Sequence, residues 1–497
     1  MIFSSIIFLF HFLPFTLAAY YIAPPKAKNT VLFICSLVFY CWGEVRFFPV
    51  MLALILINYL CGLAIARFEG RPGLRRLFLG LALVGSLGML FYFKYANFVL
   101  ESANALLGTS FAPIEGISVL PLGISFYTFQ TLSYTIDVYR RDVASEKNII
   151  DFGAYVVMFP QLIAGPIVKY RDVAAQLHVY KHRYNIAQIE EGMTIFTFGL
   201  AKKVLLADAV GALWTDIIGV ADDASITFVG LANASTGLVW LGILAYSFQL
   251  YFDFSGYSMM AIGMGKMMGF EFPQNFNYPY ISASITEFWR RWHMTLSSWF
   301  REYVYIPLGG NRKGKFRQYL NQIIVFLTSG LWHGASLTFV VWGLLNGIYM
   351  CIGKATAPWR RKMEKYNPLY CTRPTRAFFK VVCTYLLFTS CIVFFRAASF
   401  EDAAWVYSHL FTGWGAMFTD FEAFREVLVT IGFDLKMTLT LLVGLAFTEG
   451  LEAFGVPMHE FIRRYPLVLR WLLYYALAGM ILFCGAFGKS AFIYQNF

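Results

Sequence analysis

One stretch of this chain constrains its fold more than any other: the 36 residues between Arg317 and Lys354 contain no Lys, Arg, Asp or Glu. As a single helix the stretch would extend about 54 Å, whereas the hydrocarbon core of a bilayer is ~30 Å thick. We therefore predict a hairpin or two broken helices. Near the middle lies His333, and an ionisable side chain in hydrocarbon is costly unless it has a partner or a function. His333 is thus a candidate functional residue deep in the membrane.

The composition indicates a polytopic membrane protein, because 58% of the residues are hydrophobic and only 14% are charged. The net charge is +11, but the basic residues form short clusters between apolar runs. The positive-inside rule explains that pattern, so we expect no nucleic-acid partner. The eight cysteines include no Cys-x-x-Cys pair, which argues against a disulfide framework or a metal site.

The linkers between the apolar runs alternate in charge, and this alternation predicts the topology. One set is basic and is expected to be cytoplasmic, and the other set is acidic or nearly neutral. No Lys or Arg precedes Lys26, so we interpret residues 2–22 as a retained span rather than a signal peptide. Both termini then lie outside. The ten predicted crossings are 2–22, 31–42, 47–66, 77–93, 117–137, 192–218, 232–256, 377–395, 437–453 and 468–488.

A second apolar stretch, residues 152–168, has basic linkers on both flanks and must enter and leave the membrane on one side. It is interrupted by Pro160 and by Gly165-Pro166. Because 17 residues are too few to cross twice at ~1.5 Å per residue, we predict a re-entrant segment. Such backbone is tolerated in a membrane only where protein or a water-filled cavity covers it.

A second histidine, His293, lies in a segment with helical spacing of apolar residues from 284 to 300. Ser284 and Glu287 fit a capping box at its start. We predict one amphipathic helix at the cytoplasmic interface, with His293 on the apolar side and Arg290 on the polar side. The alternative for His293 is an interfacial side chain that reaches toward water.

A loop rich in glycine and basic residues follows, from Pro307 to Lys315. It is not a P-loop, but such a loop can hold a phosphorylated donor. The candidate donor-binding residues are Arg290, Arg291, Asn311 and Lys313.

Three further charged residues lie within predicted spans. Asp253 is expected to pair with a neighbouring side chain. Lys202 and Lys203 are interpreted as interfacial anchors, with donor-phosphate binding as the alternative.

Five strings in the chain resemble the membrane-bound O-acyltransferase superfamily. The similarity covers nearly the whole chain and is greatest to a bacterial branch that acts in alginate O-acetylation, peptidoglycan O-acetylation and D-alanyl transfer to teichoic acids. Met259 and Gln161 depart from the alginate pattern, which has Asp and His at these positions. The strings are 122–126, 163–166, 251–257, 288–311 and 332–334.

The resemblance implies an all-α integral membrane fold, a ring of transmembrane helices around a thin core with re-entrant or broken helices. It implies a single domain over 1–497, with N-terminal spans in 1–151, a catalytic core in 152–376, and C-terminal spans and a tail in 377–497. His333 would be the catalytic histidine and His293 a second polar site residue. The resemblance also implies that an acyl group passes from a cytoplasmic thioester such as acetyl-CoA to an acceptor outside the bacterial inner membrane.

The functional expectation is therefore O-acetylation of a cell-surface polysaccharide. D-alanyl, lipid or protein acylation by the same fold is the alternative, and a transporter is a third possibility. The partners implied are membrane lipid, the polysaccharide and an external acetyltransferase of the SGNH-hydrolase type. The last six residues, 492–497, have the spacing Phe-x-Tyr-x-x-Phe. They are similar to an acyl-relay peptide of the D-alanylation system, so Tyr494 is a candidate acyl carrier.

Overall fold

We describe the fold from a computed structural model of the chain. It describes residues 1–117, 119–163, 165–178, 185–208, 210–211, 214, 236–363, 373–397, 399–412, 449–450, 455, 461–462, 464–485 and 487. All regular secondary structure in these residues is helical. The predicted all-α membrane fold is confirmed. The arrangement of helices as a ring stays a prediction.

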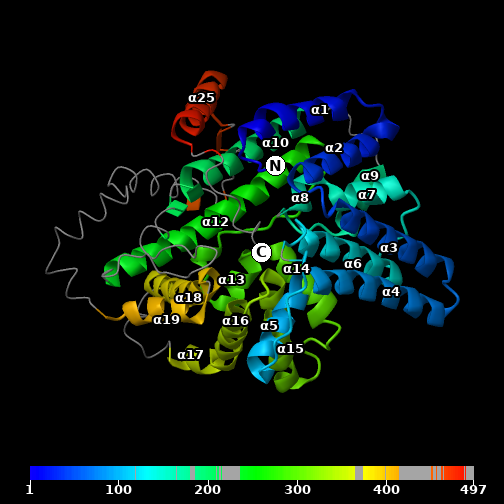
Figure 1. The fold of residues 1–497 in the computed structure, drawn as a ribbon. Helices are drawn as coiled ribbons and strands as arrows, with labels where there is room; N and C mark the ends of the chain where they lie inside the picture. The colour runs from blue at the N-terminus through cyan, green and yellow to red at the C-terminus, as the bar shows by residue number, and fades with distance from the viewer. Residues whose placement is uncertain are drawn as a thin grey trace. The chain divides into compact units, whose positions relative to one another are not determined.

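The chain folds into two compact units, whose helices are labelled in Figure 1. The first consists of Met1–Leu200 and Tyr257–Gln274, and the second of Ala201–Gly256 and Asn275–Lys489. The predicted boundaries at 152 and 377 stay a prediction. The helices of the first unit are η1 (Phe8–Phe12), α1 (Leu13–Ile22), η2 (Pro25–Ala27), α2 (Lys28–Gly43), α3 (Phe48–Arg67), α4 (Pro72–Leu90), η3 (Phe91–Tyr95), α5 (Ala96–Leu107), α6 (Ile124–Arg140), α7 (Ile149–Val157), α8 (Phe159–Leu162), α9 (Tyr170–His178) and most of α10 (Ile186–Ala201).

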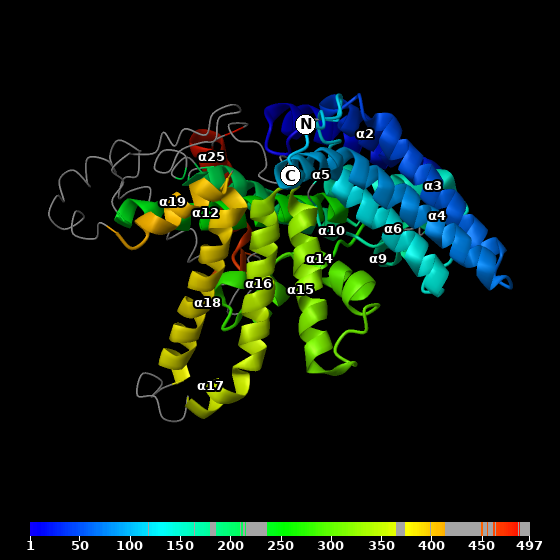
Figure 2. The ribbon, with the colours of Figure 1, turned by 60° about the horizontal axis from the view of Figure 1, so that its bottom comes forward.

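The second unit contains the predicted hairpin, and Figure 2 shows its helices α15, α16 and α18. Helix α16 packs against both α15 and α18. Helix α12 begins in this unit and ends in the first. The helices are η4 (Lys202–Ala207), α12 (Thr236–Met267), η5 (Pro279–Ile281), α13 (Ile285–Arg291), α14 (Met294–Phe300), η6 (Arg301–Tyr305), α15 (Gly314–His333), α16 (Leu337–Ala355), α17 (Ala357–Met363), α18 (Arg373–Arg396), α19 (Phe400–His409) and α25 (Leu467–Cys484).

Five helices in the described residues are long and apolar enough to cross a membrane: Phe48–Arg67, Pro72–Leu107, Thr236–Met267, Leu337–Ala355 and Pro374–Arg396. Four of them overlap predicted spans, and Leu337–Ala355 is the second arm of the predicted hairpin. Phe8–Ile22 and Leu467–Phe483 are shorter apolar helices. The count of ten crossings stays a prediction, because five of the predicted spans, 117–137, 192–218, 232–256, 437–453 and 468–488, lie partly outside the described residues.

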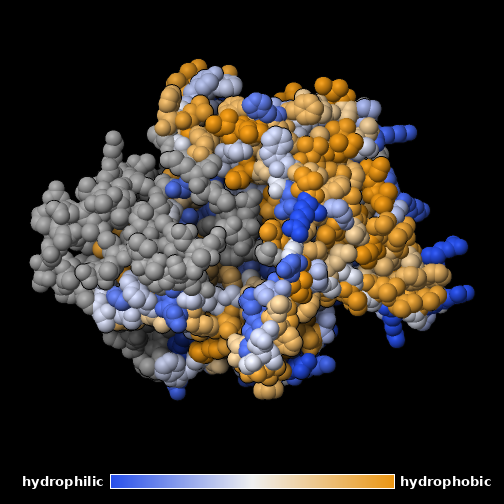
Figure 3. All heavy atoms as spheres, viewed as in Figure 1, coloured by the Kyte–Doolittle hydropathy of each residue, from blue (hydrophilic) through white to orange (hydrophobic). Residues whose placement is uncertain are grey.

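Helices α3, α4 and α6 pack together in the first unit. Polar groups join them, because Asn58 on α3 donates to Ser86 Oγ on α4 at 2.8 Å and accepts from Thr135 Oγ1 on α6 at 2.8 Å. Such hydrogen bonds link helices where lipid gives no hydrophobic driving force between them. The outer surface of α3 and α4 is hydrophobic (Figure 3), as expected of a lipid-facing surface. Its exposed apolar side chains include Leu56, Leu60, Leu77, Leu81, Val84 and Leu87.

The apolar stretch 152–168 is interrupted, as predicted from its prolines and glycine. Helix α7 ends at Val157, Met158 adopts a non-helical backbone, and α8 ends after one turn at Leu162. The residues on both sides of the break are buried, so protein covers the irregular backbone. Entry and exit on the same side of the membrane stay a prediction.

The prediction of one continuous helix over 284–300 is wrong. The helix ends at Arg291, and His293 has φ 43° and ψ 55° between α13 and α14. The cause is a neighbouring segment that binds the main chain at the break. Asn277 N donates to Arg291 O at 2.9 Å and Met294 N donates to Asn275 O at 2.9 Å, so these groups are not available for a continuous helix.

The capping box at the start of this segment is half confirmed. Ser284 Oγ accepts from Glu287 N at 3.1 Å, as predicted. The carboxylate of Glu287 accepts from Ala283 N at 3.0 Å rather than from the main chain of Ser284.

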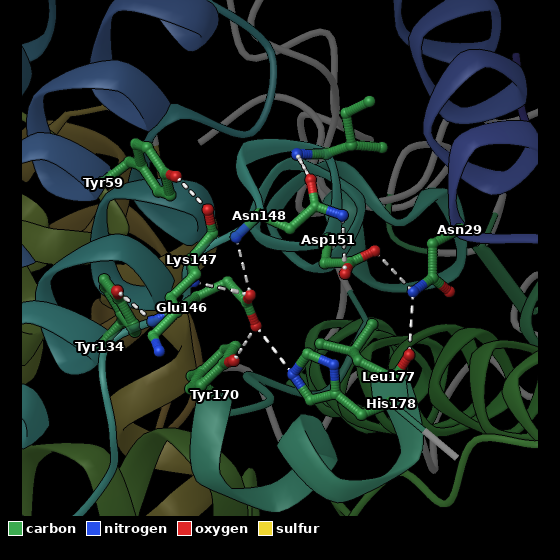
Figure 4. Close-up of polar contacts among 11 residues, drawn as sticks. Asn29, Tyr59, Tyr134, Glu146, Lys147, Asn148, Asp151, Tyr170, Leu177 and His178 are labelled. Atoms are coloured by element: carbon green, nitrogen blue, oxygen red, sulfur yellow. Dashed lines mark hydrogen bonds and ion pairs between the residues drawn. The ribbon is translucent and has the colours of Figure 1, made fainter. Parts of the chain in front are cut away.

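A buried carboxylate connects several elements of the first unit around the loop before α7 (Figure 4). Glu146 Oε1 accepts from the main-chain nitrogens of Lys147 and Asn148 at 2.8 and 2.9 Å. Its Oε2 accepts from Tyr170 OH at 2.6 Å and lies 2.9 Å from His178 Nε2. The side chain of Glu146 is 4% exposed. Burial and the neighbouring Glu146 carboxylate raise the pKa of Tyr170 well above its usual value, so its hydroxyl remains a donor.

Replacing Glu146 with Ala is expected to lower the free energy of unfolding by about 3 kcal/mol or more, because buried donors lose their acceptor. The apparent Tm of the purified protein in detergent measures this. The control is Glu69→Ala, which removes an exposed ion pair. Arg141 Nε lies 3.1 Å from Glu69 Oε1, and the two side chains are 62% and 66% exposed, respectively. Loss of this pair should lower the free energy of unfolding by less than ~1 kcal/mol. Equal effects of the two substitutions would contradict a structural role for the Glu146 cluster.

Candidate functional site

His333 is the last residue of α15, at the break between the two arms of the hairpin. Gly334 is extended, and the Ser336 side chain accepts from Thr338 N to begin α16. The buried residues of α15 recur at helical spacing toward His333, which is 3% exposed. The prediction of two broken helices with His333 at the centre is therefore confirmed. The buried face consists of Asn321, Gln322, Phe326, Ser329, Gly330, Trp332 and His333.

Two glycines let the arms of the hairpin approach closely. A Cβ atom on Gly330 would lie 2.3 Å from Phe339 O, and one on Gly343 would lie 2.4 Å from Phe326 O. Any side chain at either position would therefore separate the helices. Small residues serve this purpose at many helix interfaces in membranes. Close packing fixes the end of α15 and with it the position of the His333 ring.

Aromatic rings surround His333. The ring centroids of Trp342 and Phe395 lie 5.0 and 5.2 Å from that of His333, with steep interplanar angles of 85° and 74°. The preceding residue, Trp332, lies at 4.9 Å. These rings come from α15, α16 and α18, so three helices build the surroundings of one imidazole. Such aromatic walls limit the access of water to the imidazole.

His293 is also buried, at 1% exposure, so the alternative of an interfacial side chain reaching toward water is wrong. Its ring meets Phe254 edge-on at 4.7 Å and lies 6.2 Å from Trp332. Trp332 thus neighbours both histidines. Burial lowers the pKa of His293 to about 3, so the ring is neutral at physiological pH. Its left-handed backbone is uncommon for a residue other than glycine, and such strain is often found at functional sites.

The four candidate donor-binding residues differ in their surroundings. Arg290, Asn311 and Lys313 are exposed, with the latter two in the loop after η6. Asn321 Nδ2 supports this loop by donating to Gly310 O at 3.0 Å. Arg291 is engaged within the protein, because it pairs with Glu287 at 2.9 Å and donates to Asn277 O at 3.2 Å.

The interpretation of Lys202 and Lys203 as interfacial anchors is wrong, because they are 6% and 2% exposed. Lys203 Nζ lies 2.7 Å from Asp253 Oδ1 and 2.8 Å from Asp208 Oδ1. Lys202 pairs with Glu449. The prediction that Asp253 pairs with a neighbouring side chain is confirmed. The sequence did not show which side chains pair, because Asp253 and Glu449 lie far from the two lysines in the chain.

Asn275 is a residue that sequence reasoning missed, and it contacts His293 directly. The only available signal was the polar string Gln274-Asn275-Phe276-Asn277 shortly before the histidine motif. Tyr494, the predicted acyl carrier, lies outside the described residues. Within the residues described above, no cluster of three or more His, Cys, Asp or Glu side chains is arranged to hold a metal ion.

The sequence is similar to known acyltransferases. The profile of the membrane-bound O-acyltransferase family, MBOAT, matches residues 138–398, which include both histidines. A probable alginate O-acetylase AlgI of Pseudomonas putida is 44% identical over 421 residues, 83% of this chain and 80% of that protein. A peptidoglycan O-acetyltransferase of Helicobacter pylori is 36% identical, over 81% and 78%. A teichoic acid D-alanyltransferase of Streptococcus thermophilus is 31% identical, over 50% and 59%.

Proposed function

Because the chain belongs to the membrane-bound O-acyltransferase family and is an acyltransferase, we propose that it passes an acetyl group from a cytoplasmic thioester, acetyl-CoA, across the bacterial inner membrane for O-acetylation of a cell-surface polysaccharide. The observation that carries the proposal is the position of His333. It is a buried imidazole at the break of an apolar hairpin, enclosed by aromatic rings.

In the proposed reaction His333 is the general base. It accepts the proton of an attacking hydroxyl as the hydroxyl oxygen bonds to the thioester carbonyl carbon. The carbon–sulfur bond then breaks, and the proton passes to the leaving thiolate. General base catalysis by a positioned histidine supplies ~10²- to 10⁴-fold in rate. His293 is the second site residue, connected to the first through Trp332.

The proposed donor site uses the exposed cations Arg290 and Lys313, with Asn311 as a hydrogen-bond donor. Phosphate groups of a nucleotide thioester favour such a surface. Arg291 contributes less in this proposal, because Glu287 already pairs with its guanidinium.

The test is turnover of radiolabelled acetyl-CoA by the purified protein in liposomes, with polysaccharide acceptor outside. Release of free CoA with acetyl transfer supports the proposal. If neither acetyl-CoA nor any other acyl thioester is turned over, the chain does not use a thioester as its acyl donor. That result would contradict the proposal and favour a transporter.

D-alanyl transfer is a second candidate, favoured by the similarity to the D-alanyltransferase of Streptococcus thermophilus. The two functions differ in the donor. Turnover of a D-alanyl carrier-protein thioester, with none of acetyl-CoA, would favour the second candidate.

For the tail we propose that Tyr494 carries the acetyl group and gives it to a serine nucleophile of an external SGNH-type acetyltransferase. Tyr494 first takes the acetyl group from the thioester, and because a phenol has a pKa of ~10, this first step needs a base, which we assign to His333. Tyr494→Phe is expected to abolish acetylation of the polymer, because it removes the hydroxyl and keeps the ring. The measurement is acetyl content of the polysaccharide. A near wild-type content would rule out the relay and leave the alternative of a packed aromatic tail.

The proposed topology places both termini outside and the basic linkers in the cytoplasm. Single cysteines introduced at Arg312 and Arg361 should react with an impermeant maleimide only from the cytoplasmic side. Cysteines at Asp223 and Asp420 should react only from outside. Labelling of positions 312 and 223 from the same side would overturn the topology.

A further inference from the structure

The carboxamide of Asn275 lies at the point where the main chain breaks between α13 and α14. Its oxygen, Oδ1, accepts from Thr295 N at 3.3 Å and from Thr295 Oγ1 at 2.9 Å. The same oxygen lies 3.0 Å from His293 Nδ1. Asn275 is 1% exposed and Thr295 is 4% exposed, so these hydrogen bonds form away from water.

These contacts determine which ring nitrogen of His293 carries the hydrogen. A main-chain N–H can only donate, so the Asn275 atom that faces Thr295 N is the oxygen and not the nitrogen of the amide. A carbonyl oxygen can only accept. The hydrogen between Asn275 and His293 therefore belongs to Nδ1, and Nε2 of the neutral ring carries the lone pair.

This tautomer limits what His293 can do in a reaction. Its Nε2 accepts a hydrogen bond or a proton and cannot donate to a developing oxyanion. The left-handed backbone at His293, with φ 43°, would be unfavourable alone. It persists because Asn275 O accepts from Met294 N at 2.9 Å, so the main chain and the ring are held by the same residue.

We propose that Asn275 is a positioning residue, which holds His293 in the Nδ1–H form and presents Nε2 as an acceptor to an O–H or N–H group of a bound substrate other than the attacking hydroxyl, whose proton His333 accepts. The inference rests on the proposed function, in which His293 takes part in acyl transfer. The tautomer itself is independent of that function and is measured separately.

The first experiment is ¹⁵N NMR of the full-length protein labelled at the histidine rings. The signals of His293 are assigned as those missing in His293→Gln. We expect a hydrogen on Nδ1 and none on Nε2 at neutral pH. A hydrogen on Nε2 would overturn the proposal even if the protein transfers acetyl groups, and the expected tautomer in an inactive protein would contradict only the proposed function.

The second experiment compares three variants by kcat, KM and pH profile. Asn275→Leu removes the acceptor and should lower kcat at least about ten-fold, since a catalytic histidine in the wrong tautomer loses up to ~10⁴-fold in other enzymes. Asn275→Asp keeps an acceptor and adds a charge, so it should retain activity while the acidic limb of the pH profile moves to higher pH.

Thr295→Val is the matched control. It removes the Thr295 hydroxyl bond to the same oxygen and leaves the His293 contact. We expect a small loss of stability, an unchanged pH profile and an unchanged tautomer. If all three variants lose Tm and activity in parallel with no change in pH profile, Asn275 has a structural role only and the proposal is wrong.

Discussion

The variant His333→Ala is expected to lose at least about 99% of the acetyl transfer rate, because general base catalysis supplies ~10²- to 10⁴-fold. The imidazole is 3% exposed and lies between aromatic rings of three helices, so bulk water has little access to the position that the ring leaves. The measurement is initial rate of acetyl transfer in liposomes at saturating acetyl-CoA. A residual rate above about one hundredth of wild type would contradict the base role.

Two controls separate catalysis from folding. His333→Gln keeps more of the side-chain volume and a polar group but lacks a base, so it should be as inactive as His333→Ala with a higher Tm. His409→Ala removes a partly exposed histidine, stacked on Trp405, on α19 of the same unit and should retain the wild-type rate. If the His333 variants lose activity only in proportion to their loss of folded protein, the role of His333 is packing and not catalysis.

The hairpin around His333 was predictable because its cause is local in the sequence. The 36 uncharged residues exceed the thickness of a bilayer as one helix, so a break was necessary. The structure places the break at Gly334, where α15 ends, and at Ser336, whose side chain caps α16. The histidine strings in turn carried the family resemblance, and the family is confirmed.

The break at His293 was not predictable from periodicity. The spacing of Trp289, Trp292 and Leu296 suits one helix. The break arises from hydrogen bonds to Asn275 and Asn277, which precede the helix and approach it only in the folded chain. The helical spacing of apolar residues indicates which side chains are buried. It does not indicate that a neighbouring segment forms hydrogen bonds with the main chain.

The burial of Lys202 and Lys203 shows a second limit. A lysine in a membrane span commonly extends its charged group toward the interface, and that rule gave the wrong interpretation of Lys202 and Lys203. The partners are Asp253, Asp208 and Glu449, and Glu449 is 247 positions from Lys202. Pairing over such separations is not visible in one sequence.

Replacing Lys203 with Met is expected to destabilise the protein by about 3–5 kcal/mol, because two carboxylates remain buried without their cation. Asp208 and Asp253 are each 2% exposed at the side chain, so solvent offers them little compensation. The measurement is apparent Tm and the yield of monodisperse protein in detergent. Lys315→Met is the control, since Lys315 is exposed and its loss should leave Tm nearly unchanged.

A rescue variant identifies the cause. Combining Lys203→Met with Asp208→Asn and Asp253→Asn removes the uncompensated charges at nearly constant volume, and it should recover most of the lost stability. Recovery would show that the cluster stabilises the second unit through charge balance. If the triple variant is as unstable as Lys203→Met alone, packing of the lysine stem rather than charge holds η4 against α12. If Lys203→Met alone has a wild-type Tm, the cluster contributes nothing to stability, and its charges must be retained for another purpose.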